Sequence, residues 1–338
     1  MKKKNFWKNK KIFITGVAGF VGSNLAKNLI KNGAKVIGLT KNKKINSLLY
    51  LEKIDKKMDL IFGEITDKEL LRSIFLKNEI DICFHLAAQV EVGAATRYPY
   101  LTWETNIRGT YTLLEIIRES KQKIKSIIIA SSDKAYGDYP LKNLPYKENY
   151  ELKPLFPYDT SKACADMIAK SYSSQLFKLP ILITRFSNIY GPGQLNFTAL
   201  IPDAIRSCIL NKKFNVRSNG QAIRDFVYID DIVELYKLLS KNLYLKPKKF
   251  SGQIFNAGTN TKNRIIDIID EIFIFAKKKK ELKNIHREIK KNKTRGELSV
   301  QFMDYDKIFR YVGWKPKNKF SNTLPIIFKW YKKHLFEL

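Results

Sequence analysis

The stretch that decides the fold is Lys11-Ile-Phe-Ile-Thr-Gly-Val-Ala-Gly-Phe-Val-Gly22. Its short apolar run is typical of a buried strand, and the residues after Gly22 have the periodicity of a helix. Gly16 permits a tight turn, Gly19 lets the backbone approach a pyrophosphate, and Gly22 lets the helix pack on the strand. The free N–H groups at the start of the helix would hold phosphates. In this strand–turn–helix context the three glycines predict a dinucleotide site.

The second expected strand, residues 35–39, gives a mixed indication about which dinucleotide binds. In NAD-binding sites of this type, an acidic residue at the end of this strand binds the free 2′-hydroxyl of the adenosine ribose. The strand here ends in Thr40-Lys-Asn-Lys-Lys44 instead, and lysines at that place can bind the 2′-phosphate of NADP. Because lysine occurs throughout this chain, we expect NAD and keep NADP as the alternative.

Strands and helices alternate through the first half of the chain. Expected strands lie at residues 59–62, 81–88 and 126–130, with helical patterns at 70–77 and 106–119 between them. Alternation with continuous apolar strands predicts an α/β fold with a Rossmann-type, doubly wound parallel sheet. A smaller C-terminal α/β lobe would bind the substrate. We expect the cofactor domain at residues 1–180 with a returning segment at about 226–258, and the substrate lobe at 181–225 and 259–338.

Tyr158 and Lys162 lie four residues apart in Pro157-Tyr-Asp-Thr-Ser-Lys162, so on a helix they share one face. A nearby ammonium favours phenolate, so we expect a lowered pKa for Tyr158. A phenolate near neutral pH can take a proton from a sugar hydroxyl while a hydride leaves the same carbon. The pair predicts an oxidation of this kind.

The composition limits the classes of partner. A formal net charge of +30 and a pI near 9.8 usually raise nucleic acid or an anionic membrane as partners. Here the lysines are spread along the whole chain, which indicates a compositional bias, so we expect neither partner. The dense run from Lys277 to Lys293 contains no interleaved aromatic residues, and we interpret it as a surface segment.

Other features of the sequence favour a cytoplasmic location. No run of about 18 apolar residues occurs, and Met1-Lys-Lys-Lys leads into no apolar signal region. Cys83, Cys164 and Cys208 are far apart and odd in number, so neither disulfides nor zinc are expected. Asp230-Asp231 begins a helix, and we interpret the pair as acids that suit a helix N-terminus rather than as metal ligands. We predict no metal site.

The motifs together resemble the extended short-chain dehydrogenase/reductase family, in its nucleotide-sugar-modifying branch. They run nearly end to end: Gly16-x-x-Gly-Phe-x-Gly22, His85-Leu-Ala-Ala-Gln89, Asn106-Ile-Arg-Gly-Thr110, Ser131-Ser-Asp-Lys-Ala-Tyr-Gly137, Tyr158-x-x-x-Lys162, Arg185-Phe-Ser-Asn-Ile-Tyr-Gly-Pro-Gly193 and Ile223-Arg-Asp-Phe-Val-Tyr-Ile-Asp-Asp231. Within the branch, Ser132-Asp133-Lys134 looks like the catalytic segment of the 4,6-dehydratases. Its Asp-Lys pair is similar to that of the CDP-glucose enzymes or of the inverting UDP-N-acetylglucosamine 4,6-dehydratases. Arg224-Asp-Phe226 is more like the dTDP-glucose enzymes, so the nucleobase and the hexose stay open.

The resemblance implies a dehydration with no net redox change. Tyr158 would take the proton of the C4 hydroxyl, Lys162 would hold the nicotinamide ribose, and Ser132 would bind the C4 oxygen. Water then leaves from C5 and C6, with Asp133 as the acid at the C6 oxygen and Lys134 as the base at C5, and the hydride returns to C6. The product would be a 4-keto-6-deoxy sugar, and the cofactor would stay bound throughout.

The resemblance also implies the binding residues. The cofactor would contact Gly16, Gly19, Phe20, Val21, Gly22, Thr40, Glu64, Ile65, Leu86, Ala87, Ala88, Asn106, Tyr158 and Lys162. The substrate would contact Gln89, Asn188, Leu200, Ile201, Arg217 and Arg224. Arg224 is the expected ligand of the diphosphate, because a guanidinium meets phosphate oxygens in a planar fork.

Two rival functions stay open at this point. A 4-epimerase or decarboxylase would need Tyr158, Lys162 and Ser132 but no acid and base at 133 and 134. A non-catalytic cofactor sensor or a nucleic-acid-binding protein on the same fold would need none of these residues. The family also forms dimers through two helices of each subunit, which implies a homodimer through residues 97–120 and 158–177.

Overall fold

The computed structural model describes residues 5–120, 122–216, 218–289 and 298–337, and the chain divides into two compact units. The first unit comprises Met1–Gly137, Glu151–Phe186 and Val233–Phe255, and the second comprises Asp138–Tyr150, Ser187–Ile232 and Asn256–Leu338. The sequence predicted a division by function, into a part that binds the cofactor and a part that binds the substrate. That division stays a prediction.

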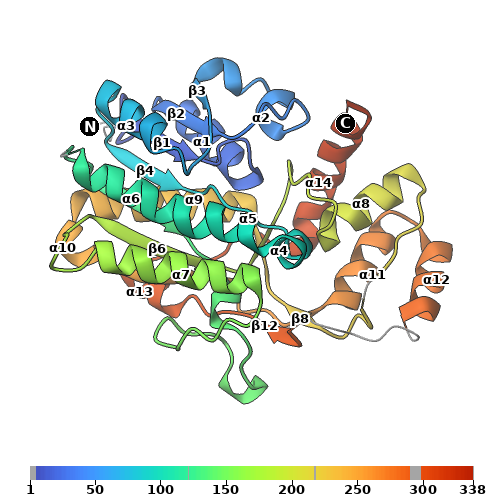
Figure 1. Cartoon of the computed structure of the whole chain (residues 1–338). Helices are drawn as coiled ribbons and strands as arrows, with labels where there is room; N and C mark the ends of the chain where they lie inside the picture. Colours follow the sequence, from blue (N-terminus) through green and yellow to red (C-terminus); the bar gives the residue numbers. More distant parts are fainter. Residues whose placement is uncertain (1–4, 121, 217, 290–297, 338) are drawn as a thin grey trace. The chain divides into compact units, whose positions relative to one another are not determined.

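A seven-stranded sheet forms the core of the first unit (Figure 1). In spatial order its strands are β10 (Ile254–Ala257), β6 (Ile181–Phe186), β5 (Ser126–Ala130), β4 (Ile82–His85), β1 (Lys11–Thr15), β2 (Lys35–Thr40) and β3 (Asp59–Phe62). The pairings from β6 through β3 are all parallel. The chain starts at β1, winds outward to β3 and then crosses back to β4. The predicted α/β fold with a doubly wound parallel sheet is therefore confirmed, and the order reverses between β1 and β4, where such sheets bind ligands.

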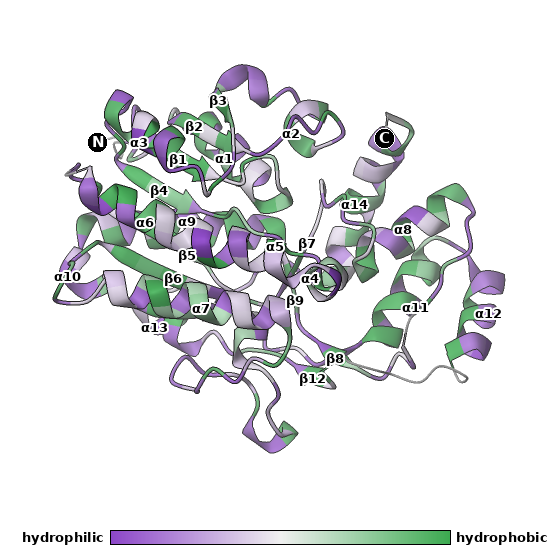
Figure 2. Cartoon of the chain, viewed as in Figure 1, coloured by the Kyte–Doolittle hydropathy of each residue, from purple (hydrophilic) through white to green (hydrophobic). Residues whose placement is uncertain are grey.

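The helices of the first unit cover the sheet. They are α1 (Phe20–Lys31), α2 (Leu48–Leu51), η1 (Asp55–Lys57), α3 (Lys68–Lys77), α4 (Val92–Arg97), α5 (Pro99–Trp103), the π-helix η2 (Glu104–Arg108), α6 (Gly109–Glu119), η3 (Asp133–Tyr136), α7 (Pro157–Tyr172), α9 (Ile229–Leu245) and α10 (Pro247–Phe250). One apolar core joins the sheet to α3, α6 and α7 through residues such as Phe13, Leu71, Leu113 and Ala169. Figure 2 shows the strands as hydrophobic and the helices as mixed in character, because only one face of each helix packs inward.

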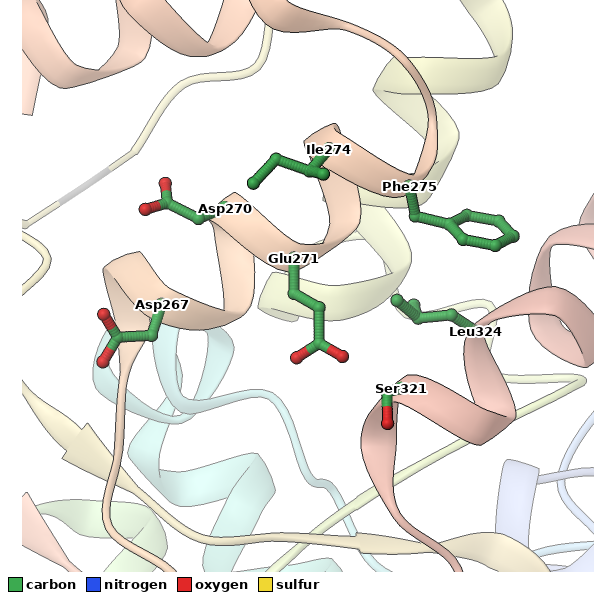
Figure 3. A pocket seen from close by; sticks show the side chains of 7 residues that line it. All are labelled: Asp267, Asp270, Glu271, Ile274, Phe275, Ser321 and Leu324. Atoms are coloured by element: carbon green, nitrogen blue, oxygen red, sulfur yellow. The ribbon is translucent and has the colours of Figure 1, made fainter.

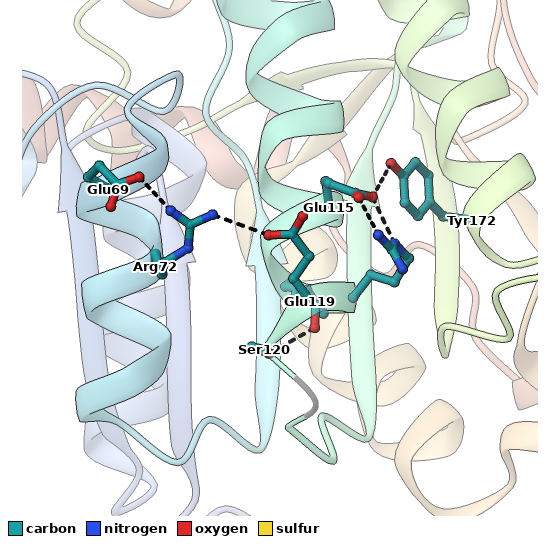
Figure 4. Close-up of polar contacts among 8 residues, drawn as sticks. Glu69, Arg72, Glu115, Glu119, Ser120 and Tyr172 are labelled. Atoms are coloured by element: carbon teal, nitrogen blue, oxygen red, sulfur yellow. Dashed lines mark hydrogen bonds and ion pairs between the residues drawn. The ribbon is translucent and has the colours of Figure 1, made fainter.

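Polar contacts also link the outer faces of α3, α6 and α7 (Figure 4). Arg72 of α3 contacts Glu69 in its own helix and Glu119 of α6, the latter at 3.3 Å. Glu115 of α6 pairs with Arg118 and accepts a 2.8 Å hydrogen bond from the hydroxyl of Tyr172 on α7. Several of these side chains are largely exposed, so water screens the charges and the pairs contribute little stability. The apolar core holds these helices in place.

A buried ion pair joins β6 to α7. The guanidinium of Arg185 donates to both carboxylate oxygens of Asp166, at 2.7 and 3.1 Å, and to the hydroxyl of Tyr136 at 2.8 Å. The two charged side chains are 4% and 2% exposed. Because Tyr136 belongs to η3, this contact fixes three elements to one another: a strand, a helix and the loop that follows β5.

The second unit contains two small sheets, β11-β8-β12 and β7-β9. Its elements are η4 (Leu141–Asn143), β7 (Asn188–Tyr190), α8 (Leu200–Leu210), β8 (Ile223–Arg224), β9 (Phe226–Tyr228), β11 (Asn263–Arg264), α11 (Ile265–Phe275), α12 (Lys279–Ile289), β12 (Val300–Gln301), α13 (Asp306–Val312), α14 (Phe320–His334) and η5 (Leu335–Glu337). The fully buried carboxylate of Asp225 accepts hydrogen bonds from the backbone of Thr259 and Met303, which ties these segments together.

The structure refines the sequence interpretation at two places and adds a contact at a third. Much of the lysine-rich run forms a helix, α12, which buries Ile285 and Ile289, while residues 290–293 lie outside the described residues. The strand expected at 81–88 ends at His85 because the next residues form a loop. Asp231 is 2% exposed, and its carboxylate accepts hydrogen bonds from the backbone of Lys317 and Asn318. It lies in the first turn of α9, as the sequence predicts, and it also anchors the segment before α14.

Among the described residues, no helix is long and apolar enough to cross a membrane.

Replacing Asp166 with Ala should lower the free energy of unfolding by about 3–5 kcal/mol, because Arg185 would stay buried without its counter-charge. Chemical denaturation measures this value. Glu69→Ala is the control: it removes a pair between exposed side chains and should cost less than about 1 kcal/mol. Equal losses in the two variants would contradict the assigned importance of the buried pair.

Candidate active site

Two glycines of the turn after β1 lie so close to other backbone that neither position admits a side chain. The bare backbone of this turn leaves room for a phosphate. A Cβ atom on Gly16 would lie 2.7 Å from the Cα of Ala87, and one on Gly22 would lie 2.5 Å from the carbonyl oxygen of Gly16. Gly16 also has a φ of +70°, which side chains disfavour. Helix α1 begins at Phe20 after Gly19, and no side chain caps it. The N–H groups at its first turn, including that of Val21, can therefore bind an anion.

The loop after β4 is fixed against this turn by a hydroxyl of β1. The backbone N–H groups of Leu86 and Ala87 donate to the Thr15 hydroxyl, at 3.2 and 3.1 Å. His85 lies between two hydroxyls, 2.8 Å from Thr15 and 3.0 Å from Thr110. Burial lowers the pKa of His85 to about 3, so the ring is neutral near pH 7. The predicted cofactor residues 86–88 thus lie beside the glycine turn at the point where the strand order reverses.

Asn106 and Gln89 are held together. The Asn106 side chain accepts a 2.7 Å hydrogen bond from the Gln89 N–H, and it donates to the Gln89 carbonyl and to the Ser161 hydroxyl. These bonds link the π-helix η2 to the loop after β4 and to α7. The Gln89 side chain donates to the Glu91 carbonyl, while its buried Oε1 has no partner among the described residues. That oxygen can accept a hydrogen bond from a bound molecule.

The end of β2 bears on the choice between NAD and NADP. Thr40 is buried, and the lysine that follows it, Lys41, forms a 2.8 Å ion pair with Glu64. Glu64 reduces the positive charge that a 2′-phosphate would need, although both side chains are exposed and the effect is modest. The neighbouring Ile65 packs against Gly109. A Cβ atom on Gly109 would lie 2.5 Å from the Cγ2 atom of Ile65.

The predicted catalytic residues meet at the carboxyl end of β5 and the start of α7. The Ser132 hydroxyl donates to Asp133 Oδ1 at 3.0 Å and accepts a 3.3 Å hydrogen bond from the Lys134 N–H. The Ser132 side chain also lies close enough to the Tyr158 phenol to lower its pKa. Asp133 is 2% exposed, and its other oxygen, Oδ2, has no partner among the described residues. Lys162 donates from Nζ to the carbonyl of Ala130 at 2.8 Å.

The expected lowering of the Tyr158 pKa by Lys162 is wrong for this structure. Burial raises the pKa of Tyr158 well above its ordinary value, the charges of Asp133 and Asp159 raise it further, and the hydrogen bond from Ser132 opposes them. Lys162 is not among the groups that shift the pKa of the phenol. Burial also lowers the pKa of Lys162 itself, to about 8, so its amine begins to lose its charge in mildly alkaline solution.

Sequence reasoning missed Asp159, the residue after Tyr158. Burial raises the pKa of its carboxyl to about 6, the charge of Lys134 lowers it, and the charge of Asp133 raises it. The signal in the sequence was an acidic residue inside the Tyr-x-x-x-Lys motif, at a place that the motif leaves unspecified.

The predicted substrate residues all lie in the second unit, apart from Gln89. Asn188 donates from its side chain to the Asp225 carbonyl at 3.2 Å. Leu200 begins α8, and Ile201 is buried behind it. Arg224 is 5% exposed, and its guanidinium donates to the carbonyls of Ile223 and Leu298. Arg217 lies outside the described residues. That any of these substrate residues contacts a substrate stays a prediction.

Helices α11 and α14 border a pocket of about 480 Å³ in the second unit (Figure 3). Its lining consists of Asp267, Asp270, Glu271, Ile274, Phe275, Ser321 and Leu324. None of the predicted site residues lines this pocket, and its acidic side chains would repel a diphosphate. We therefore do not assign it to the nucleotide sugar.

The family model described as "GDP-mannose 4,6 dehydratase" matches residues 13–326. The chain belongs to this family. The predicted place in the nucleotide-sugar 4,6-dehydratase branch of the short-chain dehydrogenases/reductases is thereby confirmed.

Curated members of the dehydratase branch resemble the chain over different lengths. It is 36% identical to a dTDP-D-glucose 4,6-dehydratase of Dictyostelium discoideum over 78% of this chain, although the match spans only 61% of that protein. It is 29% identical to the CDP-glucose 4,6-dehydratase of Salmonella typhimurium, over 97% of this chain and 92% of that protein.

Two solved structures resemble nearly the whole fold. The dTDP-glucose 4,6-dehydratase of Bacillus anthracis, in complex with NAD, has a TM-score of 0.81, 27% identity and coverage of 96% of this chain and 97% of that one. The UDP-glucose 4-epimerase of Thermotoga maritima, with UDP-glucose, has a TM-score of 0.84, 26% identity and coverage of 96% and 99%. The fold thus accommodates both chemistries, so the side chains of the site must distinguish them.

Gly16→Ala should weaken NAD binding by about tenfold or more, because the new methyl group would displace the loop at Ala87 from the phosphate turn. Calorimetric titration with NAD measures the affinity. Gly33→Ala is the matched control: Gly33 has a similar φ of +80°, but a Cβ there meets nothing closer than 3.6 Å. An unchanged affinity in a folded Gly16→Ala variant would contradict the assigned cradle.

Proposed function

We propose that this protein converts a nucleotide-diphospho-hexose to its 4-keto-6-deoxy derivative, as a 4,6-dehydratase with NAD. The observation that carries the proposal is the placement of Asp133 beside Ser132 and Tyr158. A 4-epimerase needs a tyrosine and a serine at the C4 hydroxyl but no acid for a leaving group. Here a buried carboxyl with one unpartnered oxygen adjoins both, and the next residue along the chain is a lysine.

The residues present fit NAD. The turn at Gly16 is a cradle that a Cβ would fill, and the uncapped start of α1 presents N–H groups for the pyrophosphate. We assign Thr40, Ile65, residues 86–88 and Asn106 to the rest of the cofactor site, with Asn106 acting through the loop that it holds. When bound, NAD accepts a hydride from C4 and returns it to C6.

The oxidation at C4 depends on Tyr158. Its phenol takes the proton of the C4 hydroxyl, and Ser132 hydrogen-bonds both the phenol and the substrate oxygen. Burial makes phenolate costly here, so the positive charges that approach Tyr158 in the ternary complex decide how readily the proton moves. Lys162 orients the nicotinamide ribose, and its bond to the Ala130 carbonyl fixes it at the end of β5.

The elimination uses the adjacent pair. Lys134 takes the C5 proton, which the 4-ketone has made acidic, and the C–H electrons form the C5–C6 double bond. Asp133 donates its proton to the C6 oxygen, which leaves as water. The pair lies at the carboxyl end of β5, where open parallel sheets place ligand chemistry.

For the substrate we propose a CDP-glucose-like nucleotide sugar. The relatives include CDP-glucose and dTDP-glucose enzymes, so dTDP-glucose is the next candidate. Gln89 would bind the sugar through its unpartnered Oε1 atom. Asn188, Leu200, Ile201, Arg217 and Arg224 would bind the diphosphate and the nucleoside.

Incubation with CDP-glucose or dTDP-glucose should give a product lighter by one water, detected by mass spectrometry. Tyr158→Phe should lower turnover by about 100-fold or more, with no reduction of the cofactor. Lys134→Ala should still reduce the bound cofactor, seen in its absorbance, but release no water. Normal turnover in Lys134→Ala would remove Lys134 as the base. An isobaric product from the wild type would replace dehydration with epimerisation.

We also propose that the protein is a cytoplasmic homodimer. Large apolar side chains are exposed on α5, α6 and α7, namely Tyr100, Leu101, Trp103, Tyr111 and Met167. Side chains of this kind on a surface favour a protein–protein contact. The three cysteines are free thiols, which suits a reducing compartment.

Met167→Glu should shift the protein from dimer to monomer, because the contact would bury a charge without a partner. Analytical ultracentrifugation measures the mass. Leu76→Glu on α3 is the control: Leu76 is 76% exposed, against 64% for Met167, but lies outside the proposed contact. A monomeric wild type, or a dimer unaffected by Met167→Glu, would refute this surface.

A further inference from the structure

Asp159 differs from an ordinary acidic residue at the start of a helix. Such residues usually bond the free N–H groups of the first turn or face solvent. Asp67 of this chain is an example, since it accepts a hydrogen bond from the Leu70 N–H at the start of α3. Asp159 is only 3% exposed, and within the described part of the chain no group donates a hydrogen bond to its carboxyl. Its burial therefore calls for another explanation.

The groups that act on Asp159 belong to the catalytic segment. α7 packs against η3, and η3 supplies Lys134, whose positive charge favours the Asp159 carboxylate, and Asp133, whose negative charge disfavours it. Asp159 and Asp133 both act in turn on Tyr158. The other elements that pack against α7 also carry charges, for example Arg97 and Glu104, but none of these bears on Asp159 in the described residues.

The elimination chemistry requires something that Asp133 and Lys134 cannot supply by themselves. An acid at the C6 oxygen must hold its proton until the bond to C6 breaks. Lys134 becomes an ammonium as it takes the C5 proton, and with no other counter-charge that ammonium would draw the proton from Asp133 before the bond to C6 breaks. A second carboxylate that carries the charge opposite Lys134 removes this conflict, because two adjacent carboxylates resist being ionised together.

We propose that Asp159 is a positioning residue that provides the counter-charge for Lys134, so that Asp133 keeps the proton that it donates to the leaving C6 oxygen. The inference rests on the proposed dehydratase function and adds a residue to it. In the step itself, Lys134 gains the C5 proton and becomes an ammonium beside the Asp159 carboxylate. Asp133 loses its proton to the C6 oxygen, water departs, and the net charge of the three side chains stays the same.

The proposal has a signature in the pH dependence of the elimination. Asp159 must be ionised to act, and its pKa is about 6. The rate of water loss should therefore fall as the pH drops through about 6, and this part of the profile should be absent in Asp159→Asn. A purely structural residue would lower the rate at every pH and leave the shape of the profile unchanged.

The experiment follows a single turnover of the wild type and of Asp159→Asn with a nucleotide sugar that the wild type dehydrates, from pH 5 to pH 8.5. Cofactor absorbance reports the C4 oxidation, and mass spectrometry of quenched samples reports the loss of water. For Asp159→Asn at neutral pH we expect cofactor reduction within about twofold of wild type, water loss slowed about tenfold or more, and no decline near pH 6. Asp159→Glu, which restores the charge, should recover part of the rate and the decline.

Asp267→Asn is the matched control, since it removes the same charge from the first turn of α11. It should leave both steps as in the wild type. If Asp159→Asn does not fold, as judged by circular dichroism, Asp159→Ser takes its place with the same expected result. Water loss at the wild-type rate with the decline near pH 6 retained would overturn the proposal, as would an equal slowing of both steps. A wild type that dehydrates no nucleotide sugar would instead refute the proposed function itself.

Discussion

Arg185 and Asp166 form a buried ion pair between β6 and α7, and Tyr136 brings η3 into the same contact. The proposed catalytic side chains come from two segments that are more than twenty residues apart in the sequence, and each belongs to one of these elements. A buried charge that lost its counter-charge would be costly, so the pair permits little sliding of α7 along the sheet. The convergence of Ser132, Asp133 and Tyr158 follows from this restraint.

Burial does more than position these groups, because it also sets their charges. It raises the pKa of Tyr158 and of Asp159, and it lowers that of Lys162 and of His85. In each case burial favours the neutral form of the side chain over the charged form, as expected where water is excluded. Proton transfers in such a site need little reorganisation of charge, provided that each ionised group has a partner. The proposed role of Asp159 is an instance of this condition.

The sequence predicts the sheet, the glycine turn and the dehydratase family because each depends on local patterns: apolar runs, small residues at fixed spacing, and ordered motifs. It fails where the answer depends on burial. The pKa of Tyr158 was expected to fall because Lys162 lies one helical turn away, but the tertiary structure buries both and directs Lys162 to the Ala130 carbonyl. Asp159 was overlooked for the same reason, since a one-dimensional pattern does not show which polar side chains face inward. The amphipathic helix α12 was obscured by its lysines.

His85 has a consequence for the behaviour of the whole molecule in acid. The folded ring resists protonation down to about pH 3, whereas the same ring in an unfolded chain accepts a proton near pH 6.5. Between these values the unfolded chain binds more protons, so acidification progressively favours it. The histidine also joins β1, β4 and α6 through Thr15 and Thr110. A dinucleotide bound only by the folded chain, at the turn beside this histidine, would shift the equilibrium back and so oppose acid denaturation.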